Sequence, residues 1–105
     1  LDIAKELTFS GRIIDGIEAQ ELGLVTRVAE NPRAAAIALA EEIASKSPDA
    51  VRAGKKLFEE SWHTDAKYGL ALESLLQSRL IGTANQIEAV EASFENRRPQ
   101  FTDSD

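Results

Sequence analysis

The sequence predicts a mainly α-helical fold of five to six short helices with one short strand. The first observation is a composition rich in Ala, Leu and Glu, which lose little side-chain freedom on a helical backbone. The second is a series of Ser, Thr, Asp and Asn residues that each stand just before a segment with apolar residues at helical spacing. The third is that only one short stretch alternates apolar and polar residues as a strand does.

The first elements lie before residue 24. A helix is expected over residues 2–8, and Gly11 follows it as a terminating glycine. Asp15 and Glu18 then form a capping-box pattern, in which the Asp side chain accepts from an orphan backbone N–H. The short helix that follows is expected to stop at Gly23.

Residues 24–28 (LVTRV) are the expected strand. They alternate apolar and polar side chains and include β-branched residues. One strand cannot form a sheet, so this prediction requires a pairing partner elsewhere in a longer protein or in another subunit.

Four further helices are expected, each with a start signal of its own, and a polar tail over residues 102–105 is expected to fray. The predicted helices run from Asn31-Pro32 to about Ser45, from Ser47-Pro48 to about Ser61, from Asp65 to about Ile81 with Thr64 as the cap, and from Thr83, paired with Gln86 in a capping box, to a point before Pro99. Their predicted apolar faces include Ile37, Ile43, Val51, Leu57, Tyr68, Leu72, Leu75, Leu76, Leu80, Ile87 and Val90.

Charge and composition argue against several classes of partner. The net charge of −6 disfavours binding to a nucleic-acid backbone, and the basic cluster Arg97–Arg98 is too small for that role. No stretch approaches the ~20 apolar residues that span a bilayer, so no membrane association is expected. The chain has no cysteine, which fits a cytoplasmic location.

The side chains predict no catalytic or metal site. His63 is the single histidine and lies in an expected turn, with nothing nearby in sequence to orient it as a base. One histidine and no cysteine are too few for a transition-metal site. The carboxylate pairs Glu41-Glu42 and Glu59-Glu60 are expected on solvated helix faces.

The run from Phe94 to Phe101 (FENRRPQF) is the one candidate binding site. Arg97 and Arg98 stand between aromatic residues at the end of a helix, where they could bind a phosphate while Phe94 stacks on a base ring. The alternative is that the two arginines complement the negative end of the helix dipole.

Several segments, in this order, resemble the C-terminal part of the enoyl-CoA hydratase/isomerase (crotonase) family. These segments are LTFSGR (residues 7–12), EA (18–19), LGLVTRV (22–28), SPDAV (47–51), KKL (55–57) and EAVEASFENRRPQF (88–101). Each motif is short, but their order and spacing match the family over essentially all of the chain.

The resemblance implies that residues 1–105 are the C-terminal helical domain of a crotonase-like α/β fold, with the N-terminal catalytic core absent. In the family this core carries the oxyanion hole for an acyl-CoA thioester. The implied parent is an enoyl-CoA hydratase or double-bond isomerase of fatty acid metabolism, with coenzyme A thioester as substrate and no permanently bound cofactor. The implied partners of this domain are its own N-terminal core, identical subunits in a trimer or hexamer, and acyl-CoA.

Family members place an aromatic residue and a Lys of the closing helix beside the CoA nucleotide. The corresponding positions here are Ser93 and Asn96, so the pattern is not kept. Phe94 with Arg97 or Arg98 could replace those two contacts. The chain alone is expected to be inactive, and the alternative is a free-standing helical protein–protein interaction module.

Overall fold

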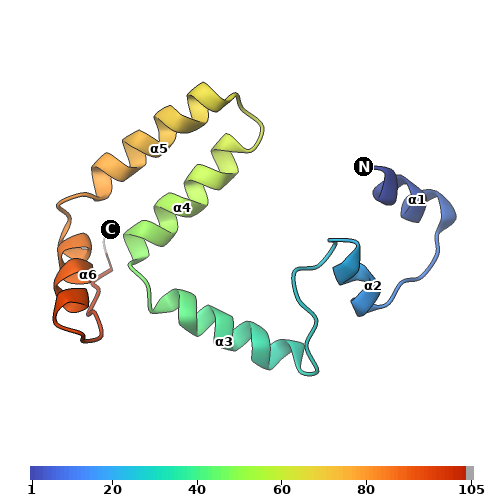
Figure 1. Cartoon of the computed structure of the whole chain (residues 1–105), viewed down its shortest axis with the longest axis horizontal. Helices are drawn as coiled ribbons and strands as arrows, with labels where there is room; N and C mark the ends of the chain where they lie inside the picture. Colours follow the sequence, from blue (N-terminus) through green and yellow to red (C-terminus); the bar gives the residue numbers. More distant parts are fainter. Residues whose placement is uncertain (104–105) are drawn as a thin grey trace. The chain divides into compact units, whose positions relative to one another are not determined.

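The computed structural model describes residues 1–103, and this part of the chain contains six helices and no strand (Figure 1). The mainly α prediction is therefore confirmed. The helices are α1 (Asp2–Ser10), α2 (Gly16–Glu21), α3 (Pro32–Ala44), α4 (Pro48–Ser61), α5 (Ala66–Leu80) and α6 (Ala84–Phe94).

Polar side chains start most of these helices at the predicted positions. Asp15 accepts from the Glu18 N–H, Asn31 from the Ala34 N–H, Ser47 from the Ala50 N–H and Thr83 from the Gln86 N–H. Each bond satisfies one of the backbone donors that have no partner within the helix.

The start of α5 was misplaced by one residue. Asp65, and not Thr64, is the cap, because the Asp65 carboxylate accepts from the Tyr68 N–H at 2.8 Å. The Thr64 hydroxyl instead donates to the Ser61 carbonyl at 3.0 Å, in the turn that follows α4.

The predicted strand at residues 24–28 is wrong. This stretch forms bends and irregular backbone, and the N–H groups of Leu24 and Val25 both donate to the Ala19 carbonyl in the last turn of α2. A strand needs the hydrogen bonds of a neighbouring strand, and no strand occurs within residues 1–103.

The chain divides into two units, the first being Leu1–Ala38. Arg12 links α1 to α2 within this unit, since its guanidinium donates to Glu6 at 3.3 Å and to Glu18 at 2.6 Å. The unit leaves large apolar side chains exposed, among them Phe9 at 82% and Ile13 at 97%. The first unit therefore carries apolar surface that its own residues leave uncovered.

The second unit begins at Leu39, and residues 39–103 of it are described. Helices α4 and α5 pack side by side as an antiparallel hairpin, as Figure 1 shows. Its small buried core consists of Leu72 and Leu76 of α5 and Ala92 of α6. The two leucines were among the predicted apolar positions. Tyr68 and Leu75, which were predicted on the same stripe, are about half exposed.

Helix α3, which contributes to both units, has no buried residue although its sequence is strongly apolar. No helix among residues 1–103 is long and apolar enough to cross a membrane.

Candidate functional site

The predicted binding residues lie at the end of α6 and in the stretch that follows it, residues 97–103, which we call the C-terminal segment. Phe94 is the last residue of α6 and its side chain is 83% exposed. Arg97 and Arg98 begin the C-terminal segment. The structure thus brings the three residues to one end of one helix.

A tight turn sets the direction in which the C-terminal segment leaves α6. Asn96 adopts the left-handed conformation, with φ 52°, and the Arg97 N–H donates to the Ala92 carbonyl at 3.0 Å. The Asn96 N–H donates to the Ser93 carbonyl at 3.4 Å, which completes a Schellman motif. The chain consequently turns back toward the helix it has just left.

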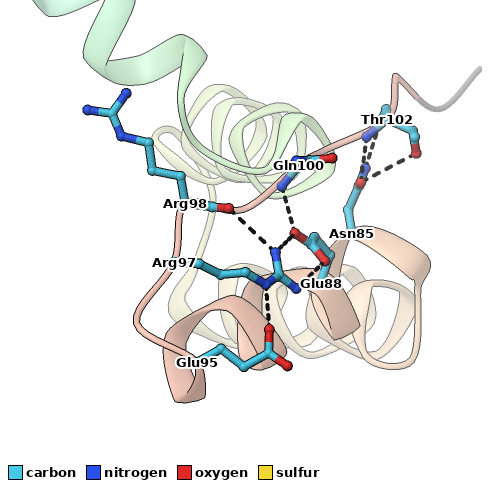
Figure 2. Close-up of polar contacts among 7 residues, drawn as sticks. All are labelled: Asn85, Glu88, Glu95, Arg97, Arg98, Gln100 and Thr102. Carbon is cyan, nitrogen blue, oxygen red and sulfur yellow. Dashed lines mark hydrogen bonds and ion pairs between the residues drawn. The ribbon is translucent and has the colours of Figure 1, made fainter.

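Arg97 is held by two carboxylates (Figure 2). Its guanidinium binds both oxygens of Glu88, with Nη2 3.0 Å from Oε2, and its Nε donates to Glu95 at 2.5 Å. Paired bonds of this kind match the planar fork of arginine to the two oxygens of a carboxylate. The hydrogen bond with Glu88 is the main cause that raises the pKa of Arg97, and the bond with Glu95 adds to it.

Glu88 has a second partner in the main chain. Its Oε1 accepts from the Gln100 N–H at 2.7 Å. The hydrogen bond from Arg97 and then this backbone bond lower the pKa of Glu88 to about 2. Glu88 therefore stays ionised over the whole neutral range.

Arg98 differs from its neighbour. Its side chain is exposed and makes no hydrogen bond or ion pair with the residues that the structure describes, although its carbonyl accepts from Arg97 Nη1 at 3.4 Å. In Figure 2 its guanidinium points away from the Glu88–Arg97 pair. Of the two arginines, Arg98 is the one with no carboxylate partner among the described residues.

Asn85 holds the far end of the C-terminal segment. Its side-chain amide accepts from the Thr102 N–H at 3.0 Å and donates to the Thr102 carbonyl at 2.7 Å, so that it pairs with the main chain as a neighbouring strand would (Figure 2). The side chain is only 3% exposed. The expectation of a frayed tail is therefore wrong for Thr102, and residues 104 and 105 lie outside the described residues.

The other side of the C-terminal segment borders a groove of about 310 Å³. Its wall includes Ile43 of α3, Val51 of α4 and Phe101 of the segment itself. Arg52 at its edge binds Asp103 at 2.5 Å. The segment is thus held against α6 by Asn85 and Glu88, and next to α4 by Arg52.

No catalytic arrangement forms among the residues considered for one. His63 is exposed in the turn after α4. Glu59 and Glu60 face solvent and pair with Lys55 and Lys56 at 3.8 and 3.7 Å, one helical turn earlier. Within residues 1–103, no group of three or more His, Asp or Glu side chains could hold a metal ion.

The anchors Asn85 and Glu88 were not singled out from the sequence. Glu88 lies nine residues before Arg97 and Asn85 lies 17 before Thr102, and neither separation matches a helical spacing. The usable signal in the sequence was this pair of polar residues, which stand three positions apart on a predicted helix.

Several known proteins resemble this chain over most of its length. A family model described as enoyl-CoA hydratase/isomerase matches residues 1–104. Enoyl-CoA hydratase domain-containing protein 2, mitochondrial, of Mus musculus is 39% identical over 105 residues, which cover 94% of this chain and 36% of that protein. A putative enoyl-CoA hydratase of Thermus thermophilus is 36% identical, over 93% of this chain and 40% of its own length.

Solved structures show the same similarity to enoyl-CoA hydratases. The crystal structure of enoyl-CoA hydratase from Bacillus anthracis superposes with a TM-score of 0.91 at 36% identity, over 96% of this chain and 40% of that one. The chain spans about a third of the length of the curated relatives that it matches first. The six helices therefore correspond to the helical part of the crotonase fold, and the chain belongs to the enoyl-CoA hydratase/isomerase family.

Proposed function

We propose that residues 1–105 are the C-terminal helical domain of an acyl-CoA-handling enzyme, either an enoyl-CoA hydratase or a double-bond isomerase. The observation that carries the proposal is a family match over residues 1–104, in a chain that spans about a third of its relatives. On this proposal the domain supplies subunit contacts and part of the lid over coenzyme A, and it is inactive without the catalytic core.

The exposed apolar side chains support a role in contacts. Large apolar residues are exposed in both units, for example Phe9 and Ile13 in the first and Phe58, Trp62 and Leu70 in the second. Contiguous apolar surface of more than a few hundred Å² rarely stays uncovered in a monomer. We assign this surface to contacts with the catalytic core and with identical subunits in a trimer or hexamer.

The charges at the end of α6 support a role in binding CoA. Arg98 offers an uncommitted guanidinium for a phosphate, and Phe94 offers an exposed ring for the base. Arg97 already binds Glu88 and Glu95, so a phosphate would compete with two carboxylates for its guanidinium. The proposed contacts are therefore Arg98 and Phe94, and a contact from Arg97 would require its guanidinium to leave a carboxylate.

The test uses the protein encoded by the native gene and short enoyl-CoA substrates. We expect hydration or double-bond migration with that protein and none with residues 1–105 alone. Arg98→Ala should weaken the binding of the CoA thioester about tenfold, the scale of one charge-assisted hydrogen bond. Arg79→Ala, which removes another exposed arginine near the end of a helix, is the control and should change nothing.

An interaction module is the alternative that the same exposed apolar residues favour. It becomes the better explanation if the native gene product has a mass near 11.4 kDa, that of this chain, and no activity toward enoyl-CoA. A cytoplasmic location stays a prediction, and the Mus musculus and Arabidopsis thaliana relatives are named as mitochondrial.

A further inference from the structure

Arg98 sits in a short loop whose two ends are bound by the same carboxylate. Glu88 binds the guanidinium of Arg97 on one side of Arg98 and the N–H of Gln100 on the other. Pro99, between them, has a fixed φ and limits the conformations of the loop. Figure 2 shows the two contacts on Glu88 with Arg98 outside them.

A second residue of α6 holds the C-terminal segment beyond this loop. Asn85, three residues before Glu88 on α6, binds both main-chain groups of Thr102. Residues three apart lie on the same face of a helix. The C-terminal segment is thus fixed at residues 97, 100 and 102 by one face of α6, while the Arg98 side chain stays exposed.

Holding the backbone of Arg98 has a consequence for binding. Association costs free energy whenever a mobile segment becomes ordered, and a segment that is already ordered does not pay that cost again. A guanidinium on a fixed backbone must lose only its side-chain freedom when it binds a phosphate.

We propose that Glu88 is a positioning residue for Arg98, which it holds in place to receive a phosphate of the CoA nucleotide. The inference rests on the proposed function, because it takes the phosphate of a CoA thioester as the ligand of Arg98. Glu88 itself touches no ligand on this proposal. Its carboxylate acts through Arg97 and the Gln100 N–H.

The test compares Glu88→Ala, Arg98→Ala and the double variant in the protein encoded by the native gene. Each single substitution should raise KM for a CoA thioester about tenfold with little change in kcat. The KM of the double variant should be no higher than that of Arg98→Ala alone, since the two residues act as one unit. Glu91→Gln, an exposed carboxylate one turn further along α6, is the control.

A second substrate separates positioning from general damage to the fold. An N-acetylcysteamine thioester carries the same acyl group without any phosphate, so its turnover should not respond to Glu88→Ala or Arg98→Ala. If Glu88→Ala does not fold, Glu88→Gln serves, because its amide oxygen still accepts from the Gln100 N–H while the charge is lost. It should raise KM by an intermediate factor.

Hydrogen exchange of the peptide covering residues 97–103, measured on the same variants, reports the anchoring directly. Faster exchange in Glu88→Ala together with the shared rise in KM is the expected result. The inference is overturned if Arg98→Ala raises KM but Glu88→Ala does not, if their effects multiply, or if exchange stays unchanged. If Arg98→Ala leaves KM unchanged, the proposed CoA contact fails, and the inference fails with it.

Discussion

Asn85 and Asp49 meet across 36 residues of sequence, with the side-chain nitrogen of Asn85 2.9 Å from Oδ2 of Asp49. Asp49 lies in the first turn of α4, and Asn85 lies at the start of α6. The other amide hydrogen of Asn85 is bound by the Thr102 carbonyl. The Asn85 oxygen accepts from the N–H and the hydroxyl of Thr102, so this buried position requires a side chain that donates two hydrogen bonds and also accepts.

Asn85→Asp should destabilise the chain by about 1–3 kcal/mol, the usual cost of unmaking buried hydrogen bonds. The new carboxylate cannot donate to the Thr102 carbonyl, and it would face the carboxylate of Asp49. Urea denaturation at neutral pH measures the loss.

Asp49→Asn in the same chain should restore part of that stability, because an amide at position 49 can donate to the new carboxylate. Asp49→Asn alone is the matched control for the loss of an acidic residue in the first turn of α4. If the loss of stability in the double variant equals the sum of the two single losses, the two side chains do not interact.

The ion pair of Glu88 with Arg97 should make stability depend on acid pH. The pKa of Glu88 is lowered from its ordinary 4.5 to about 2. A carboxylate with a lowered pKa in the folded state stabilises the fold fully above its unfolded pKa, and this stabilisation is lost as the pH falls toward the folded value.

Thermal melts of the parent chain and of Glu88→Gln over a range of pH isolate this effect. The parent should melt at the higher temperature at pH 7, and the difference should shrink steadily between pH 4.5 and about 2. A difference that is constant across this range would mean that the charge of Glu88 contributes nothing to folding.

The sequence predicted what depends on near neighbours. The caps at Asp15, Ser47 and Thr83 each bond to a backbone N–H three residues on, so a short window contains both partners. Thr64 and Asp65 stand side by side, and either residue type can cap a helix, so the sequence left the choice between them undetermined. The expected strand at residues 24–28 failed because a strand depends on a partner that a local pattern cannot supply.

The candidate site divides in the same way. The chemistry of the side chains was enough to find Phe94, Arg97 and Arg98 in the sequence. It could not show which of the two arginines is paired with carboxylates and which is not. That division follows from the left-handed turn at Asn96, which brings Arg97 back to a carboxylate nine residues earlier. The contacts of Asn85, 17 and 36 residues away, depend on how the second unit packs.

Two glycines of the second unit should respond oppositely to alanine. Gly82, between α5 and α6, has φ 82°, so Gly82→Ala should cost about 1–2 kcal/mol although its Cβ would meet nothing within 4 Å. Gly54 lies inside α4 with open space at its Cβ position, so Gly54→Ala should stabilise the chain by about 0.5–1 kcal/mol. Urea midpoints compare the two variants directly, and changes of the same sign would contradict the assigned backbone conformations.

The small core of the second unit should be sensitive to truncation at Leu76 and tolerant at Leu70. Leu76 of α5 is buried, and Leu76→Ala should cost about 2–3 kcal/mol through lost burial and the cavity left behind. Leu70, on the same helix, is 66% exposed, so Leu70→Ala should stay within about 0.5 kcal/mol in a monomer. Denaturation at low protein concentration tests both variants. If Leu70→Ala becomes costly only as the concentration rises, this face of α5 is covered by another copy of the chain, because stability that comes from association depends on concentration.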